Sequence, residues 1–547
     1  MNGYRHVLGL ALAIGLAWGQ TNRAAPAPPA LIPAPVRIQT WPGIFTLTSS
    51  TVIRAGPGAE TEAEKLAAAL RLPTGFALRV VAEATGEPAV ELALDRSLES
   101  RLGPEGYRLA VGPESVRIRA ASPAGLFYGG ITLRQLLPPE VFCANRVTPR
   151  PKGGWTAPCV EIEDYPRFAW RGLLLDVARH FMPPEFICKL VDLMALHKLN
   201  SLQLHLTDDQ GWRLEIRKYP RLTQVGSVRK ESPIKGDRNR GDGIPYGPFF
   251  YTQSQVRELV AYAAARHVTL VPEIEIPGHF MAALAAYPEL SCRGGPFEVR
   301  TRWGIELDIL CPGNDAAVAF VQEVLAEVVE LFPSQFIHIG GDEAPRDRWK
   351  SCPKCQARLK AEGLKTEAQL QTWLNRRIEE FLATQGRRLI GWDEIMEGGL
   401  TPRAAVMSWR GTAGGLVAAQ AGHDVVMCPT SHCYFDYAQA HGPDEPECIG
   451  GFIPLPTVYW FEPVPTGLPE ANRRHIVGAQ GNLWTEFMWR PQDVEYFAFP
   501  RAVALAEVVW SPPQRRSFED FLRRLEPHLK RLDMRQVNYR RLDQRSR

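Results

Sequence analysis

The chain has 547 residues, of which 45% are hydrophobic and 22% charged, a composition that argues against wholesale disorder and against a coiled coil. Lysine and arginine total 63 against 60 aspartate and glutamate residues, so net charge gives no reason to expect nucleic acid or an anionic membrane as a partner. At roughly 150 residues per domain, the length allows three domains or one large barrel with attachments.

The first residues have the pattern of an export signal. Arg5 and His6 precede an apolar run over residues 7–17, which is followed by small residues suited to a signal peptidase. The run is too short to span a bilayer. We expect a signal peptide over residues 1–19, a Pro-rich linker over 20–35, and a secreted or periplasmic protein without a membrane anchor. The absence of any Asn-x-Ser/Thr sequon favours a bacterial source.

Residues 36–158 show short, mixed patterns. Strand-like alternation occurs at Thr46–Ile53 and Tyr107–Val111, and helical spacing occurs at Glu60–Leu70 and Ala124–Leu137. These patterns predict an α+β domain without a catalytic cluster of its own. The end of this region, Glu140–Pro158, resembles a loose connector.

From Arg171 onward, short apolar runs recur, and each runs into polar or aromatic residues. The eight runs are Leu173–Val177, Leu202–Leu206, Thr269–Ile274, Phe336–Ile339, Arg388–Gly391, Ala405–Ser408, Val425–Cys428 and Ile476–Gln480. Helical patterns separate most of them, at Pro184–Lys198, Ser254–Arg266, Ala316–Leu331 and Glu367–Thr384. Eight such units predict a (β/α)₈ TIM barrel over residues 165–547, ending in a helical segment, with its active site at the carboxyl ends of the strands. A doubly wound sheet is disfavoured because the Gly-rich turn after the first strand is missing.

The pair Asp342-Glu343 follows the fourth run and two glycines that allow the backbone to approach a ligand. Burial there should raise the pKa of at least one of the two acids. In most glycosidases, two carboxylates from separate strands flank the scissile bond, which neighbours in one loop cannot easily do. If Glu343 protonates the leaving oxygen, Asp342 must act beside the anomeric carbon. A 2-acetamido group, whose carbonyl oxygen can attack from within the substrate, is a suitable partner for it.

Few motifs in the sequence indicate a metal site or a cofactor site. No HExxH or Gly-x-Ser-x-Gly motif occurs, and His205, Asp208, Asp209 and His279 are better explained as orienting hydrogen-bond pairs than as metal ligands. The Cys352–Cys355 C-x-x-C has no second pair at zinc-ribbon spacing, so a local disulfide or two buried thiols is favoured over a metal. Pairing of Cys292 with Cys311, or among Cys428, Cys433 and Cys448, is plausible. We expect no metal and no cofactor.

Several of these strand ends resemble the motifs of glycoside hydrolase family 20, the exo-β-N-acetylhexosaminidases. The matching segments are Trp170–His180, His205–Trp212, Pro272–His279, His338–Glu343, Gly391–Glu394, Met407–Gly411, Tyr434–Asp436 and Trp484–Glu486. The N-terminal region also resembles the family's companion α+β domain.

The resemblance implies a role for each catalytic residue. Glu343 would be the general acid and then the general base, and Asp342 would hold the acetamido group and stabilise an oxazolinium intermediate. Tyr434 would hydrogen-bond the acetamido oxygen. Asp208 and His279 would form a relay to Glu343, with Asp209 an open alternative to Asp208.

The resemblance also implies how the sugar would bind. Trp392, Trp409 and Trp484 would enclose the acetamido methyl group, and Arg179 would bind the 3- and 4-hydroxyls. Asp436 and Glu486 would contact the 4- and 6-hydroxyls. An insertion over residues 347–366 could rim the site or only lengthen a loop.

The sequence therefore predicts a retaining hydrolase that removes terminal β-linked N-acetylglucosamine or N-acetylgalactosamine from glycans or chitin-type oligosaccharides. Release of a disaccharide such as lacto-N-biose, a non-catalytic carbohydrate-binding barrel, and metal-dependent deacetylation are the alternatives. The sequence leaves the natural glycan and the oligomeric state open.

Overall fold

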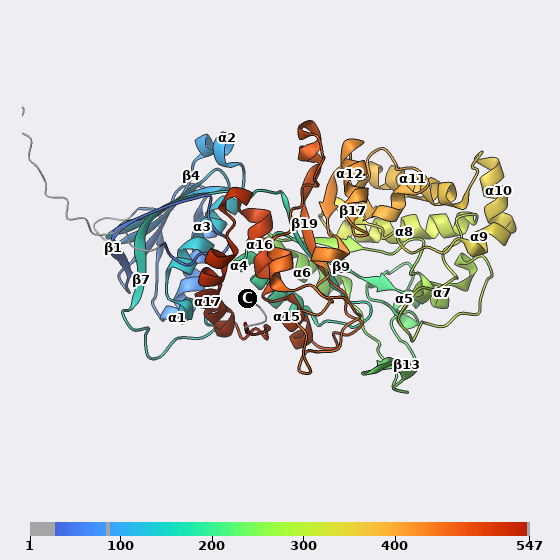
Figure 1. The fold of residues 1–547 in the computed structure, drawn as a ribbon, viewed down its shortest axis with the longest axis horizontal. Helices are drawn as coiled ribbons and strands as arrows, with labels where there is room; N and C mark the ends of the chain where they lie inside the picture. The colour runs from blue at the N-terminus through green and yellow to red at the C-terminus, as the bar shows by residue number, and fades with distance from the viewer. Residues whose placement is uncertain (1–27, 84–87, 544–547) are drawn as a thin grey trace, which may run out of the picture.

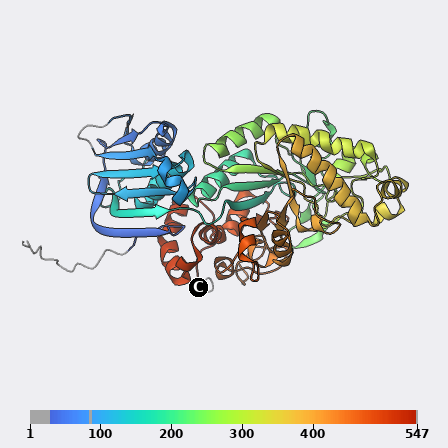
Figure 2. The ribbon, with the colours of Figure 1, turned by 90° about the horizontal axis from the view of Figure 1, so that it is seen from above.

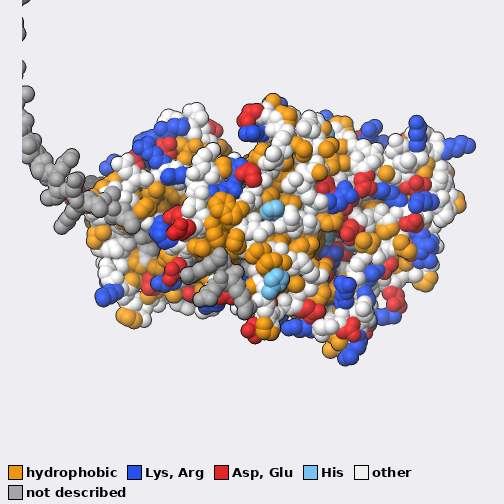
Figure 3. Space-filling view, in the orientation of Figure 1, with side chains coloured by type: hydrophobic (Ala, Val, Ile, Leu, Met, Phe, Trp, Pro, Cys, Tyr) orange, Lys and Arg blue, Asp and Glu red, His pale blue; other side chains and the backbone are white. Residues whose placement is uncertain are grey.

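The computed structural model describes residues 28–83 and 88–543 (Figure 1). The predicted signal peptide and the first part of the predicted linker lie outside the described residues. A β-sheet domain and a barrel domain lie side by side, with the C-terminal helix α17 (Phe518–Met534) packed where they meet. On the face shown in Figure 3, acidic and basic side chains are interspersed over both domains.

The N-terminal domain is a seven-stranded sheet in the order β1-β7-β5-β6-β4-β2-β3. Its long helices α1 and α3 pack between the sheet and the barrel (Figure 2). The elements are β1 (Arg37–Leu47), β2 (Val52–Ala55), α1 (Glu60–Thr74), β3 (Val80–Val81), β4 (Ala89–Leu94), η1 (Arg96–Leu98), α2 (Glu99–Leu102), β5 (Tyr107–Val111), β6 (Ser115–Ala120), α3 (Pro123–Leu136), η2 (Pro139–Phe142) and β7 (Trp155–Asp164). The predicted α+β domain is confirmed.

Three sequence-based expectations for this domain are wrong. The strand expected over Thr46–Ile53 is interrupted by a turn, because β1 ends at Leu47 and β2 begins at Val52. The segment expected to be a loose connector ends inside strand β7, which pairs with β1 and β5 and buries Trp155 in the core. Residues 28–35, expected to be linker, are packed: Leu31 and Ile32 are buried, and the Ile32 N–H donates to Gln135 Oε1 at 3.0 Å. The two apolar residues between the prolines account for this packing, because their burial removes apolar surface from water.

The second domain is a closed barrel of eight parallel strands. They are β8 (Trp170–Asp176), β9 (Ser201–His205), β14 (Thr269–Glu273), β15 (Phe336–His338), β16 (Arg388–Trp392), β17 (Ala405–Ser408), β18 (Val425–Met427) and β19 (Ile476–Leu483). Strand β19 pairs with β8 and closes the ring. Each predicted strand overlaps one of these, so the TIM barrel prediction is confirmed.

The four predicted helices correspond to α4 (Pro184–Leu196), α6 (Gln253–Ala264), α8 (Asp315–Leu331) and α11 (Glu367–Thr384). Local sequence fixes their starts: Pro184 occupies the first turn of α4, and Thr252 and Gln255 form a capping box on α6. Further helices of the barrel domain are α12 (Ala413–Gln420), α15 (Pro491–Ala498) and α16 (Arg501–Trp510). None of the described helices is both long and apolar enough to cross a bilayer.

Shorter elements fill the loops above and around the barrel. They are β10 (Thr207–Asp208), β11 (Gly211–Trp212), α5 (Arg221–Gln224), β12 (Pro233–Ile234), β13 (Asp237–Gly241), α7 (Met281–Ala286), η3 (Pro288–Leu290), α9 (Asp347–Ser351), α10 (Pro353–Ala361), η4 (Asp393–Met396), α13 (Thr430–Cys433), α14 (Leu455–Tyr459), η5 (Glu470–His475) and η6 (Pro513–Arg515).

A buried ion pair joins the two domains. Lys198, just after α4, donates to Asp164 Oδ2 of β7 at 2.8 Å, and the Tyr107 hydroxyl donates to the same oxygen at 2.7 Å. The other oxygen of Asp164 accepts from Trp510 Nε1 at 3.0 Å. The Lys198 ammonium and the Asp164 carboxylate are therefore paired with each other and also hydrogen-bonded. Such partners offset the cost of removing two charges from water.

Candidate active site

A cavity of about 790 Å³ opens at the carboxyl ends of the barrel strands. It is lined by most of the predicted site residues: Arg179, His279, Asp342, Glu343, Trp409, Tyr434, Asp436, Trp484 and Glu486. Asp208 and Trp392 do not line it and lie one layer deeper, each 1% exposed. The barrel thus brings together residues that are more than 300 positions apart in the sequence.

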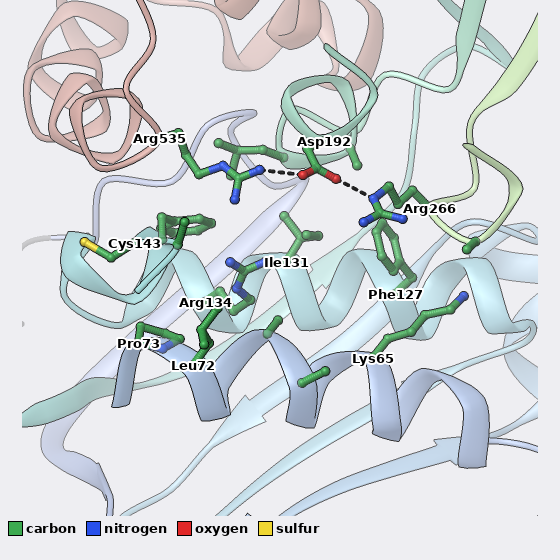
Figure 4. Close-up of a pocket in the computed structure, with 17 residues that line it drawn as sticks. Lys65, Leu72, Pro73, Phe127, Ile131, Arg134, Cys143, Asp192, Arg266 and Arg535 are labelled. Carbon is green, nitrogen blue, oxygen red and sulfur yellow. Dashed lines mark hydrogen bonds and ion pairs between the residues drawn. The ribbon is translucent and has the colours of Figure 1, made fainter. Parts of the chain in front are cut away.

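A second cavity, of about 390 Å³, lies where the N-terminal domain meets the barrel (Figure 4). Its acid, Asp192, is bound by Arg266 and Arg535, whose Nη2 lies 2.5 Å from Asp192 Oδ2. The acid is neutralised by these partners, and no second acid lines this cavity, so it lacks the paired carboxylates needed for acid–base chemistry.

The loop after β15 turns sharply to present Asp342 and Glu343. Gly340 has φ +64°, and a Cβ there would lie 1.8 Å from Glu275 Oε2. Gly341 has φ +96°, and Glu343 itself is held at φ +43°. A left-handed non-glycine backbone is strained and is often found at functional sites. Glycine is therefore required at position 340, where a side chain would collide with a buried acid.

His279 lies between two sets of acids. Its Nε2 is 3.5 Å from Glu343 Oε2 and 3.8 Å from Asp342 Oδ2. On the other side, Nδ1 is 3.3 Å from Asp209 Oδ2, within hydrogen-bond geometry, and 3.4 Å from Asp208 Oδ1. Both aspartates are thus close enough to orient the imidazole, and Asp209 makes the hydrogen bond.

Arg179 connects this network to the far side of the cavity. Its Nη2 lies 2.8 Å from Asp208 Oδ2 and 4.0 Å from Glu486 Oε1. The guanidinium also stands 5.2 Å from the ring centroid of Trp484. Asp208 therefore contacts mainly Arg179, whereas Asp209 forms the hydrogen bond with His279.

A buried network supports the floor of the site. Glu273 Oε2 accepts from Gln203 Nε2 and His205 Nδ1, both at 2.8 Å, and Glu273 Oε1 accepts from Trp392 Nε1 at 2.9 Å. Burial alone would raise the pKa of Glu273, but the charges of His338 and His205 hold it well below its usual value. Burial likewise opposes protonation of His205, whereas the charge of Glu273 raises the pKa of His205 to about 10. The imidazole of His205 is thus held between Glu273 and Asp208.

Aromatic rings form one wall of the cavity. Trp409 stacks on Tyr434 with ring centroids 6.0 Å apart, and Trp484 lies 6.3 Å from Tyr434. The Trp409 Nε1 donates to Glu394 Oε2 at 2.8 Å. Trp392 packs behind Trp484 at 5.8 Å. Its role as part of the methyl-binding wall stays a prediction.

Three acids that line the cavity have buried oxygen atoms without a hydrogen-bond partner: Asp342 Oδ1, Asp436 Oδ1 and Glu486 Oε2. Burial raises the pKa of Asp436 well above its usual value and also raises the pKa of Glu486. Buried acceptors of this kind are costly unless a donor reaches them. A ligand rich in N–H and O–H groups would supply such donors.

The two neighbouring acids have opposite pKa shifts. Burial, with the negative charge of Glu343, raises the pKa of Asp342 to about 6, which confirms the expectation for at least one of the pair. The hydrogen bond from His279 lowers the pKa of Glu343. For His279, burial opposes protonation, but the charge of Asp208 and hydrogen bonds to neighbouring acids raise its pKa well above the usual value. These two shifts favour a protonated His279 beside an ionised Glu343.

Sequence reasoning missed the rim of the cavity and two buried acids beneath it. The rim residues are Arg238 and Asn239 on the short strand β13, and Arg302, Trp303, Ile305, Tyr437 and Ile449 in loops without regular spacing. The abundance of tryptophan was the only sequence signal for Trp303. Glu275 and Glu394 lie within the quoted motifs, but no role was assigned to them. The 347–366 insertion contributes no lining residue to the described cavity.

Two family models match the chain. "Glycosyl hydrolase family 20, catalytic domain" matches residues 168–513, and "Glycosyl hydrolase family 20, domain 2" matches residues 28–165. A β-hexosaminidase of Porphyromonas gingivalis is 45% identical over 93% of this chain, which spans 64% of that relative's length. A β-hexosaminidase of Akkermansia muciniphila is 37% identical over 80% of this chain and 85% of the relative.

Solved structures agree with these matches. The β-N-acetylhexosaminidase of Streptomyces coelicolor superposes with a TM-score of 0.81 at 33% identity, covering 95% of this chain and 99% of that one. A mutant β-hexosaminidase of Streptomyces plicatus, solved with its product GlcNAc, has the same TM-score at 32% identity and the same coverage. On fold, domain order and sequence similarity together, the chain belongs to glycosyl hydrolase family 20.

Proposed function

We propose that the chain is an exo-acting β-N-acetylhexosaminidase that releases terminal β-linked N-acetylglucosamine or N-acetylgalactosamine with retention. The observation that carries the proposal is the placement of Asp342 and Glu343 on one loop, in a cavity walled by aromatic rings and lined by unpartnered acid oxygens. Adjacent acids cannot flank a glycosidic bond from opposite faces, so the nucleophile comes from the substrate. The names of the relatives, and the GlcNAc complex of the Streptomyces plicatus enzyme, support the same sugar class.

In this mechanism Glu343 protonates the leaving oxygen while the acetamido oxygen attacks the anomeric carbon. The carboxylate of Asp342 accepts a hydrogen bond from the acetamido N–H and offsets the positive charge of the cyclic oxazolinium. Tyr434 donates to the acetamido oxygen, and Trp409 and Trp484 exclude water around the methyl group. Glu343 then takes a proton from water, which opens the oxazolinium and retains the configuration.

The rest of the sugar contacts the opposite side of the cavity. Arg179 is positioned by Asp208 and offers guanidinium N–H groups to the 3- and 4-hydroxyls. Asp436 and Glu486 accept hydrogen bonds from the 4- and 6-hydroxyls with the oxygens that lack protein partners. The ring hydroxyls thereby satisfy acceptors that would otherwise be buried without a donor.

The proton needed by the leaving group is held by the Glu343–His279 pair. The side chain of Glu343 is 36% exposed, so a substrate that covers it removes water and favours its neutral form. The proton then moves from His279 Nε2 to Glu343 Oε2 along their contact. Asp209 and Asp208 stabilise the positive charge of His279 whenever the proton resides there.

Replacing Glu343 by Gln tests the acid directly. We expect turnover to fall by roughly 10²–10⁴-fold, the usual contribution of a positioned proton donor. Aryl glycosides with very acidic leaving groups should lose much less in the bond-breaking step, because they need little protonation. The control is Glu380→Gln on α11, whose partner Arg377 lies 3.4 Å away at the surface. An equal loss for all leaving groups would contradict the assignment.

Replacing Trp484 by Ala tests the aromatic wall. We expect the loss of transition-state binding to be about 1–3 kcal/mol, the contribution of an apolar pocket to holding a small group. The measurement is kcat/KM together with the melting temperature, and the control is Trp460→Ala, which removes a 55% exposed ring outside the cavity. If the Trp484 variant unfolds while the Trp460 variant does not, Trp484 belongs to the core.

The pH profile tests which protonation state is active. Asp342 must be ionised to act, and its raised pKa of about 6 means that kcat/KM is high above pH 6 and falls as the pH drops through that value. The residual activity of Asp342→Asn, measured with an activated aryl glycoside, should lack this acidic limb. A rate that rises as the pH falls through 6 would show that the neutral acid is the active form.

A further inference from the structure

Four cysteines converge beside the barrel, away from the proposed catalytic cavity. The Sγ atoms of Cys292, Cys311, Cys352 and Cys355 all lie within 4.8 Å of one another. Three of these thiols are buried and Cys292 is half-buried. All ten cysteines of the chain lie in the described residues and are free thiols, so neither of the pairings considered plausible, Cys292 with Cys311 or among Cys428, Cys433 and Cys448, is formed.

Three separate segments bring these thiols together. Cys292 follows η3, and Cys311 follows Leu310, which forms an antiparallel bridge with Ser291. Cys352 and Cys355 stand at the start of α10, which lies at the end of the barrel domain remote from the N-terminal sheet (Figure 1). The C-x-x-C thus finds its second pair in cysteines that are 19 positions apart in the sequence.

The backbone is shaped to let these segments meet. A Cβ on Gly313 would lie 2.3 Å from the backbone N of Cys355 and 2.3 Å from the carbonyl carbon of Lys354. Since neither backbone atom can move freely, the Cys311-Pro-Gly313 turn can approach the C-x-x-C turn only with glycine at this position.

The sulfur spacings fit a shared metal better than disulfides. Sγ of Cys311 is 3.5 Å from Cys355 and 3.8 Å from Cys352, and Cys292 is 3.8 Å from Cys355. A tetrahedron with Zn–S bonds of about 2.3 Å has edges of about 3.8 Å. A disulfide needs about 2.05 Å and serves only two sulfurs, whereas Cys311 and Cys355 each approach more than one neighbour.

We propose that Cys292, Cys311, Cys352 and Cys355 bind one Zn²⁺ as a tetrathiolate structural site. Four thiolates complete the tetrahedron and leave no position for water or substrate, which is the arrangement of structural rather than catalytic zinc. Apolar side chains surround it: Ile309, Trp349, Leu359 and Leu370 form a small buried cluster with the cysteines.

The proposed zinc site joins the two loops that carry His279 and Glu343. Cys292 and Cys311 lie in the long excursion after His279, and Cys352 follows Glu343 by nine positions. Trp349 Nε1 donates to the Leu310 carbonyl at 3.0 Å, and Ala344, next to Glu343, packs on the same cluster. Zinc would cross-link the segment after β14 to the segment after β15 and would limit variation in the distance between His279 and Glu343. The metal itself takes no part in the reaction.

Metal analysis of the full-length chain tests the proposal. After exhaustive dialysis, mass spectrometry of the native protein and elemental analysis should find one zinc per chain. Replacement of the zinc by Co²⁺ should give the intense visible bands of a tetrahedral tetrathiolate site. Cys355→Ser should lose the zinc and melt at a lower temperature. The control Cys188→Ser, on α4 outside the cluster, should keep the zinc and the melting temperature of the unchanged protein.

Three results would overturn the proposal. They are two disulfides among these cysteines in the metal-free protein, four alkylatable thiols with no bound metal, or zinc retained undiminished in Cys355→Ser. If Cys355→Ser fails to fold, titrating the intact protein with a mercurial decides the matter. Zinc release in step with thiol modification supports the site, and thiol modification without zinc release contradicts it. All these readouts are independent of glycosidase activity.

Discussion

The contacts of His279 with acids on both of its sides are the interactions on which the site depends. Without Asp208 and Asp209, burial would favour a neutral imidazole, and Glu343 would lack a proton partner. Asp208 is in turn neutralised by Arg179 at 2.8 Å, so the same aspartate contacts His279 and positions the arginine that we propose binds the sugar hydroxyls. Glu343, His279, Asp208 and Arg179 are therefore one electrostatic unit.

Barrel closure makes this unit possible. Parallel strands end at the same edge, so β9, β14 and β15 deliver Asp208, His279 and Glu343 to adjacent positions although the chain between them is long. Two of these residues, His279 and Glu343, have positive φ values, and Gly340 is needed because any side chain would collide with Glu275. The surrounding barrel has to hold this strained backbone in place.

Much of this arrangement could be predicted from the sequence. Apolar runs with polar ends gave the eight strands, because the strands of a buried parallel sheet are apolar throughout and function collects at their carboxyl ends. The adjacency of Asp342 and Glu343 was enough to indicate a nucleophile within the substrate. Local patterns did not reveal features that depend on contacts between distant segments. Leu31 and Ile32 look like part of a proline-rich linker, and Trp155 like part of a connector, until the core that buries them is seen.

The four clustered cysteines and the rim of the cavity are further features that local sequence patterns could not predict. Spacing identified only the Cys352–Cys355 turn, because Cys292 and Cys311 acquire their relation to it through the fold. Trp303 reaches the cavity from an irregular loop, where neither a helical nor a strand period gives its direction. The choice between Asp208 and Asp209 likewise required the positions of Arg179, which contacts Asp208, and of His279, which contacts both aspartates.

In the proposed mechanism, the acetamido oxygen of the substrate is the nucleophile. This role can be tested by measuring the rate of the bond-breaking step for aryl glycosides whose acetyl methyl carries none, one, two and three fluorine atoms. Fluorine withdraws electron density from the carbonyl oxygen with little change in size, so we expect a steep fall in rate along the series and almost no reaction with a plain 2-hydroxyl. A shallow dependence, together with a covalent glycosyl adduct on an aspartate or glutamate of the enzyme, would contradict it.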